Sequence, residues 1–228
     1  EAKNRILEPI PIHRGTVGVE FFPESGELVH DVSNRVYFFA HDAQEKPVHI
    51  QGRVVDGQGG EVVAVQTIHD GRGVFAFQPQ RGQNYRLELD SASDAVEQPD
   101  LPPVSERQFL ALNAAPGVFA AGQPLKVRLL TNAERPVAVS AVCRGVVVGQ
   151  QLVSPTVFQR ESASGGLEVV VPVADTAEGV IRLTAYDYGV QPPAPVAERL
   201  VFRRPVRKLA IQPDQAVGRH QPGDSVQL

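Results

Sequence analysis

Six histidines are the side chains of this sequence best suited to metal binding or proton transfer. They are His13, His30, His41, His49, His69 and His220. A zinc site requires ligands that converge, often in closely spaced pairs with a thiolate or carboxylate nearby, and none of the six shows such a spacing. His41 and His69 each precede an aspartate, but in predicted turns where both residue types are commonly solvated. The histidines therefore predict no metal site.

Acidic residues gather in one turn near the start of the chain, where Glu24, Glu27 and Asp31 follow one another closely. A second pair, Asp214 and Asp224, lies near the end. Calcium would need several of these oxygens to converge on one point. We favour the alternative, that these carboxylates are solvated side chains of turns.

Nucleophile and phosphate-binding motifs are absent from the sequence. There is no Gly-x-Ser-x-Gly, no Ser-x-x-Lys and no cysteine with a histidine partner at a recognised spacing. The glycine clusters at 57–60 and 71–73 lie between predicted strands, with no following helix whose first turn could hold an anion. The sequence thus predicts a protein without catalytic residues, metal ligands or cofactor, which is not an enzyme.

Cys143 is the single cysteine and cannot form a disulfide within the chain. It lies in the apolar run AVCRGVVV, which favours a small buried side chain over a reactive thiol. A disulfide to another chain stays open.

Charged residues recur towards the C-terminus at Glu198-Arg199, Arg203-Arg204 and Arg207-Lys208. We interpret them as the solvent face of a strand, where alternating charge keeps a sheet edge soluble. A docking patch is the alternative.

Two tyrosines flank an aspartate in the run Tyr186-Asp187-Tyr188. The run is typical of the end of a sandwich strand, where a ring is buried and its hydroxyl is hydrogen-bonded. A platform for stacking a sugar is the alternative.

The composition predicts an all-β protein. Valine is frequent, Gly (20) and Pro (19) divide short apolar runs, and Met and Trp are absent. The net charge of -4 offers no basic surface for nucleic acid. No apolar run approaches the roughly 20 residues of a membrane span, and we expect neither a transmembrane segment nor a signal peptide.

Short apolar runs between turns predict tandem antiparallel β-sandwiches of immunoglobulin-like size. Polar, proline-bearing residues 91–106 predict an extended spacer between two of them. The predicted strands are 17–22, 35–40, 48–55, 61–68, 74–77 and 84–89, followed by 109–114, 125–130, 137–148, 156–160, 167–173, 179–186 and 197–202. The predicted organisation is a terminal strand and connector of a preceding domain (1–15), two sandwiches (16–98 and 99–205) and the first strands of a truncated third domain (206–228).

A repeated strand entry supports this organisation. Pro23, Pro116 and Pro213 lie roughly 95 residues apart, about the length of one sandwich. Each proline precedes a polar segment and then an apolar strand, and these strands contain Val36-Tyr37-Phe38, Val127-Arg128-Leu129 and Val226-Gln227-Leu228.

Motifs spread over most of the chain point to a family. In order they are FFPESGELV (21–29), NRVYF (34–38), GRVVDGQGGEV (52–62), TIHDGRGVFAFQP (67–79) and GQNYRLEL (82–89). Together they resemble a macroglobulin domain of bacterial alpha-2-macroglobulin-like proteins. PVAERLVFRRP (195–205) and QPGDSVQL (221–228) are similar to the last strand of one such domain and the opening of the next.

The resemblance implies fibronectin-type-III-like sandwiches repeated in a large extracytoplasmic protein, periplasmic or at the cell surface, that traps proteases. In such proteins the chemistry lies in a cleavable bait segment and, in many members, a thioester formed in a Cys-x-Glu-Gln motif. Cys143 is followed by Arg144, Gly145 and Val146, so no functional residue of the family is carried over.

The chain is then expected to be a non-catalytic scaffold. Its implied partners are neighbouring macroglobulin domains of the same chain and, through the full-length protein, proteases. The alternative is an adhesion or ligand-binding array of sandwiches in a large bacterial envelope protein.

Overall fold

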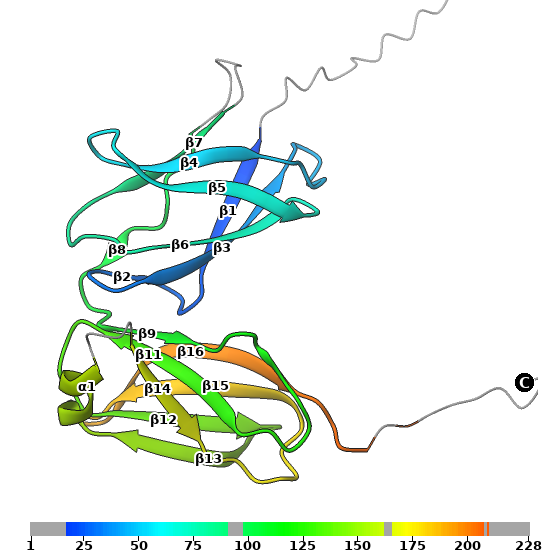
Figure 1. Cartoon of the computed structure of the whole chain (residues 1–228), viewed down its shortest axis with the longest axis vertical. Helices are drawn as coiled ribbons and strands as arrows, with labels where there is room; N and C mark the ends of the chain where they lie inside the picture. Colours follow the sequence, from blue (N-terminus) through cyan, green and yellow to red (C-terminus); the bar gives the residue numbers. More distant parts are fainter. Residues whose placement is uncertain (1–16, 91–97, 162–165, 208, 210–228) are drawn as a thin grey trace, which may run out of the picture.

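The computed structural model describes residues 17–90, 98–161, 166–207 and 209. Within them the chain forms two β-sandwiches stacked one on the other (Figure 1). Nearly all regular structure is β-strand, and the main pairings are antiparallel, so the fold is all-β with tandem immunoglobulin-like sandwiches.

The first sandwich contains eight strands. They are β1 (Gly18–Pro23), β2 (Leu28–Val29), β3 (Asn34–His41), β4 (Gln51–Asp56), β5 (Glu61–His69), β6 (Arg72–Phe77), β7 (Tyr85–Leu89) and β8 (Val104–Ser105). Six of them follow the order β1-β3-β6-β5-β4-β7, while β2 pairs in parallel with β8. Strands from both ends of this order share one core, so the sheet folds over itself.

Alternation of apolar and polar residues builds the first core. In β3 every second residue is buried, including Val36 and Phe38. They pack with Phe75 and Phe77 of the neighbouring strand β6 and with Tyr85 of β7. The ring centroids of the successive pairs Phe38–Phe75, Phe75–Phe77 and Phe77–Tyr85 lie 6.2, 5.9 and 5.0 Å apart.

The second sandwich contains eight strands and one helix. They are β9 (Leu110–Asn113), β10 (Val118–Phe119), β11 (Leu125–Thr131), β12 (Val137–Cys143), β13 (Val146–Val153), α1 (Pro155–Glu161), β14 (Leu167–Val171), β15 (Gly179–Asp187) and β16 (Ala194–Arg203). A three-stranded sheet, β14-β11-β9, packs on a five-stranded sheet, β10-β16-β15-β12-β13.

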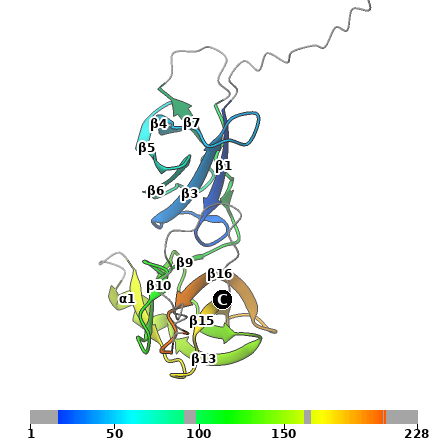
Figure 2. The same ribbon diagram turned by 90° about the vertical axis from the view of Figure 1, so that its right-hand side faces the viewer.

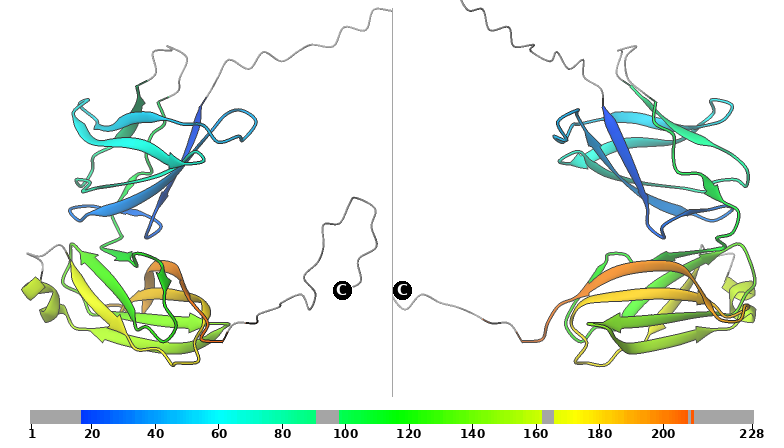
Figure 3. Two further views of the ribbon diagram at one scale, coloured as in Figure 1. Left: turned by 45° about the vertical axis from the view of Figure 1, so that its right-hand side comes forward. Right: turned by 180° about the vertical axis from the view of Figure 1, so that it is seen from behind.

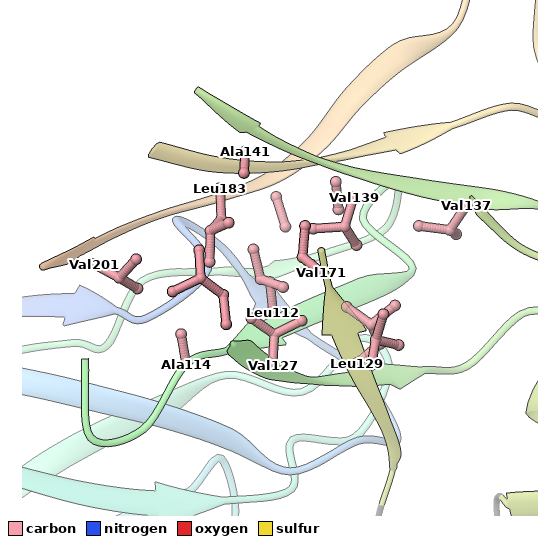
Figure 4. Close-up of a cluster of buried hydrophobic side chains, with 14 of the residues drawn as sticks. Leu112, Ala114, Val127, Leu129, Val137, Val139, Ala141, Val171, Leu183 and Val201 are labelled. Atoms are coloured by element: carbon pink, nitrogen blue, oxygen red, sulfur yellow. The ribbon is translucent and has the colours of Figure 1, made fainter. Parts of the chain in front are cut away.

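Branched aliphatic side chains fill the second core, as the close-up in Figure 4 shows. Leu112, Val127 and Leu129 of the smaller sheet meet Val139 and Leu183 of the larger one, and all five are buried. Part of the high valine content therefore lies in this core, while other valines, such as Val146 and Val180, are exposed.

The two sandwiches share their opening geometry. Gly26 and Gly117 each adopt a positive φ (93° and 81°) just before the short strands β2 and β10. Each of these strands then pairs in parallel with the last strand of its own sandwich, β8 or β16. The segments that follow Pro23 and Pro116 therefore have the same local structure. Pro213 and most of 206–228 lie outside the described residues, as does the predicted connector 1–15.

Two predicted strands are wrong. The segment 156–160 lies in helix α1, because Ser154 and Pro155 suit the position before a helix and its first residue, and Phe158 buries its ring in the core. The segment 137–148 is a hairpin, β12 and β13, because Arg144 and Gly145 both take positive φ values (50° and 80°) and reverse the chain. The other predicted strands correspond to observed ones, with shifted ends.

The extended spacer predicted for 91–106 is also wrong for its described part. The amide of Leu87 donates to Pro99 O (2.9 Å), and the amide of Leu101 donates to Tyr85 O (2.9 Å). Leu101 is 6% exposed and Val104 packs on the same core. Residues 99–105 therefore complete the first sandwich; residues 91–97 lie outside the described ranges.

The interpretation of the charged run near β16 as a solvent face is wrong at two arginines. Strand β16 pairs with β15 along its length and with β10 only at Phe202 and Arg203, so its C-terminal end is covered on both sides. Arg203 is 2% exposed, and its guanidinium donates to Gln123 O (3.0 Å), Ala174 O (2.9 Å) and Ala177 O (3.0 Å). Arg199 faces the first sandwich, as described below. Arg204 and Arg207 are exposed as expected.

Removing the Arg203 guanidinium should destabilise the second sandwich. Arg203→Ala leaves three carbonyl oxygens without their donor and should lower the free energy of unfolding by about 3 kcal/mol. Chemical denaturation measures the change. The adjacent, exposed Arg204→Ala is the matched control and should stay within about 0.5 kcal/mol of the parent chain; equal losses at both positions would contradict the structural role of Arg203.

Candidate functional site: the joint between the sandwiches

The two sandwiches meet at a joint formed by the turn and strand that follow β1 and by the outer side of β9 and β11 (Figures 2 and 3). Strand β9 pairs only with β11, so it is the edge of its sheet. An edge strand carries backbone groups that need partners, and here the first sandwich supplies them.

Ser25 closes the middle of this edge. Its hydroxyl accepts a hydrogen bond from the amide of Leu112 (2.8 Å) and donates one to the carbonyl of the same residue (3.4 Å). Gln108 adds a further link, because its side-chain amide donates to Ser25 O (3.4 Å) and to Leu110 O (3.3 Å). Ser25 is 7% exposed, so these bonds are shielded from water.

Glu24 brings a buried charge into the joint. Its side chain is 1% exposed, and Oε1 accepts from the amide of Ala114 (3.4 Å) and lies 3.4 Å from Arg199 Nε. Oε2 lies 3.7 Å from Arg35 of the first sandwich. The Arg199 guanidinium also lies over the Tyr37 ring, 5.4 Å from its centroid. Because the Glu24 carboxylate pairs with an arginine of each sandwich, it restricts the position of one sandwich relative to the other.

The solvated-turn interpretation is therefore wrong for Glu24. A buried carboxylate is stable only when it is paired, and the two arginines that pair with it come from β3 and β16. Glu27 and Asp31 of the same turn are exposed, as that interpretation predicts.

An apolar cluster lies beside these polar contacts. Val29 and Val32 of the first sandwich pack against Ala111 and Leu130 of the second, and all four are buried. Burial of this cluster stabilises the contact without a preferred direction, whereas the directional polar contacts fix the angle between the two sandwiches.

A histidine bridges the far side of the joint. Asn132 Nδ2 donates to His30 O (3.0 Å) and lies 3.1 Å from His30 Nε2, while His30 Nδ1 lies 2.8 Å from Asp31 Oδ2. The contact joins a turn of the first sandwich to the loop after β11. No sequence signal marked this pair, because its two members are far apart in the chain.

Two small cavities open beside the joint. One, of about 310 Å³, is lined by residues that include Asp31, Val32 and Phe158. The other, of about 330 Å³, is lined by residues that include Arg35 and Arg128. Among the described residues, neither lining pairs a serine or cysteine with a histidine as nucleophile and base.

The remaining histidines lie apart from the joint. His41 stacks on Phe39 and contacts Asp42 O, His49 contacts Thr67, and His69 is an exposed neighbour of Asp70. Among the residues that the structure describes, no three His, Cys, Asp or Glu side chains converge as a metal site. His13 and His220, like Asp214 and Asp224, lie outside the described ranges.

Cys143 is buried at the end of β12, in agreement with the apolar run around it, and its thiol lies 3.4 Å from Glu178 O. The run Tyr186-Asp187-Tyr188 differs from expectation, because its buried member is Asp187, which pairs with Arg135 at 2.7 Å. The Tyr188 ring is 38% exposed, although its hydroxyl accepts from Gln150 (3.3 Å).

Two carboxyl groups with lowered pKa values lie outside the joint. Hydrogen bonds from Arg86 and Arg53 hold the pKa of Glu88 below its ordinary value, and the backbone amides of Lys46 and Gln44 do the same for Asp42. Both groups are ionised and stabilised by local donors, which is the opposite of a carboxyl group prepared to donate a proton.

No family model matches the sequence, and no curated protein is similar to it. Several solved structures are similar to the chain at low sequence identity and low TM-score. The BSP domain of a biofilm-associated protein is 13% identical with a TM-score of 0.37, over 85% of this chain and 30% of that one. Alpha-2-macroglobulin of Escherichia coli, activated by porcine elastase, is 16% identical with a TM-score of 0.31, over 83% of this chain and 23% of that one.

The adhesin InvE of Yersinia pseudotuberculosis is similar to the same degree: 13% identical, TM-score 0.27, over 83% of this chain and 60% of that one. The chain thus spans about a third or less of the first two proteins. The similar structures thus include an alpha-2-macroglobulin, a biofilm-associated protein and an adhesin. Within the described residues, no helix has the length and apolarity to cross a membrane.

Removing the Ser25 hydroxyl should loosen the joint. Ser25→Ala leaves the amide and carbonyl of Leu112 without their partner. It should lower the free energy that stabilises the contact between the sandwiches by about 1 to 2 kcal/mol. Hydrogen exchange at the Leu112 amide reports the loss. Ser33→Ala, at a nearby exposed serine, is the control; unchanged Leu112 exchange in Ser25→Ala would exclude the proposed contact.

Proposed function

We propose that this chain is a non-catalytic structural scaffold within an alpha-2-macroglobulin-like protease-trapping protein. The observation that carries the proposal is the joint: Glu24 and Ser25 tie the first sandwich to β9 and β16 of the second through buried contacts. Such contacts suit a unit whose task is to hold and transmit position. They do not provide a group for bond-breaking chemistry.

The family assignment within this proposal rests on the sequence motifs. The turn motif FFPESGELV contains Glu24 and Ser25, and PVAERLVFRRP contains Arg199 and Arg203. In the structure these two motifs meet across the joint or anchor the second sandwich. Two of the motifs that carry the resemblance thus contribute side chains that join or anchor the sandwiches, which supports a scaffold of repeated macroglobulin domains.

The mechanism would be conformational. In a protease trap, cleavage of a distant segment moves domains, and sandwiches joined by firm contacts pass that movement on as rigid bodies. The implied partners are neighbouring macroglobulin domains and, through the full-length protein, proteases, in an extracytoplasmic setting. The chain itself would need no cofactor.

A second candidate, an adhesion or ligand-binding array, is favoured by one surface. On the outer face of the five-stranded sheet, Val118, Val180, Leu200 and Phe202 are 41 to 59% exposed and lie on neighbouring strands. An apolar face of this kind commonly contacts another protein.

We also propose that the chain contains two complete domains. The sequence places the boundary between 98 and 99, with domains at 16–98 and 99–205 and a partial third at 206–228. The contacts of Pro99, Leu101 and Val104 favour moving the boundary to a point after Ser105.

Fragment stability tests the boundary. A fragment of residues 16–106 should unfold cooperatively and be more stable than a fragment of 16–98 by about 3 kcal/mol or more, because the shorter one exposes the core beneath Leu101 and Val104. Denaturant titrations of both fragments give the difference. If the two fragments are equally stable, the boundary after residue 98 is the correct one.

Protease trapping is tested on the full-length protein that carries this chain. After incubation with a panel of endoproteases, a trap leaves hydrolysis of a small peptide substrate intact while hydrolysis of a large protein substrate falls. The isolated 228-residue chain is the control and should inhibit neither. Loss of neither activity with any protease would favour the adhesion array.

A further inference from the structure

The contact between His30 and Asn132 requires one protonation state of the histidine. His30 O can only accept a hydrogen bond, so the Asn132 atom that lies 3.0 Å from it must be the amide nitrogen. The same nitrogen lies 3.1 Å from His30 Nε2. Since Asn132 Nδ2 has no lone pair to offer, Nε2 must be the acceptor and must carry no proton.

The other ring nitrogen fits this assignment. His30 Nδ1 lies 2.8 Å from Asp31 Oδ2, and a carboxylate accepts. Nδ1 therefore carries the proton, and the imidazole is neutral with a defined tautomer. The His30 side chain is 15% exposed, and the residue directly follows Val29 of the buried apolar cluster.

We propose that the joint is pH-sensitive and that protonation of His30 at Nε2 loosens the contact between the sandwiches. An added proton places an N–H against the N–H of Asn132. Turning the Asn132 amide over does not relieve the conflict, because its oxygen would then face His30 O. Each arrangement loses one of the two hydrogen bonds across the joint at this point and sets like atoms against each other.

The charged groups around His30 allow the protonated form to arise. Asp31 is the carboxylate on its own turn, and it faces the imidazole directly. From the second sandwich, Glu134 and Arg135 follow Asn132 in the same loop, and Arg135 is held by Asp187 (2.7 Å) and the Phe109 ring. Glu24, Arg35 and Arg199 form their own ion pairs elsewhere in the joint. Unperturbed imidazoles change charge between about pH 5 and 8, and this general range sets the pH values of the test.

Hydrogen exchange of single amides tests the proposal on the 228-residue chain. The Leu112 amide, which donates to Ser25 across the joint, reports opening of the joint, and the Leu101 amide, bonded to Tyr85 O within the first sandwich, is the internal reference. Between pH 8 and pH 5 the protection factor of Leu112 should fall roughly tenfold relative to that of Leu101, the effect of losing one hydrogen bond.

Three variants assign the effect. His30→Gln keeps an acceptor for Asn132 without titrating, so its protection factor should not change with pH. Asn132→Ala should lower Leu112 protection at both pH values and remove the pH dependence. His69→Gln, at an exposed histidine that also pairs with an aspartate, should respond like the parent chain. No fall in the parent chain, or an undiminished fall in His30→Gln, would overturn the proposal.

Discussion

The arrangement of this chain depends on the unpaired edge of β9. Leu110, Leu112 and Ala114 each present a backbone group that the sheet does not satisfy, and Gln108, Ser25 and Glu24 in turn bond to them. An edge strand left open invites pairing with other chains. Here side chains of the turn after β1 bond to this edge, so the first sandwich packs on the edge strand of the second.

The buried charge follows from the same geometry. Glu24 reaches the Ala114 amide only by leaving solvent, and a buried carboxylate must then be compensated. Arg35 from the first sandwich and Arg199 from the second supply that compensation, and the Arg199 guanidinium also lies over the Tyr37 ring. Specific angles between sandwiches arise because such contacts tolerate little displacement, whereas the apolar cluster around Leu130 would tolerate sliding.

Two sandwiches with a joint of this kind can keep their arrangement and still respond to pH. Ser25 and the apolar cluster act at any ordinary pH, but His30 contributes only while it is neutral. The joint therefore combines a permanent contact with a conditional one. Extracytoplasmic proteins meet changes in pH that cytoplasmic ones rarely do, so a conditional contact suits the setting proposed for this chain.

The sequence by itself determined the local part of this structure. Alternation in segments such as 35–40 and glycine turns such as 57–60 predicted strands and hairpins, because side-chain periodicity and positive φ are properties of a few neighbouring residues. The same reasoning placed Cys143 in a core. It failed at 156–160, where a short amphipathic segment fits either a strand or a helix turn and the packing of Phe158 decides.

Only the tertiary structure decided the joint. Glu24 and Arg199, Ser25 and Leu112, and His30 and Asn132 are separated by most of a sandwich or more along the chain. In the sequence, Glu24 is one carboxylate in a polar turn and Arg203 is one arginine in a charged run, and both are typical of solvent-exposed positions. Whether a charged side chain is solvated or buried depends on which distant strand lies over it, and a pattern of neighbours does not contain that information.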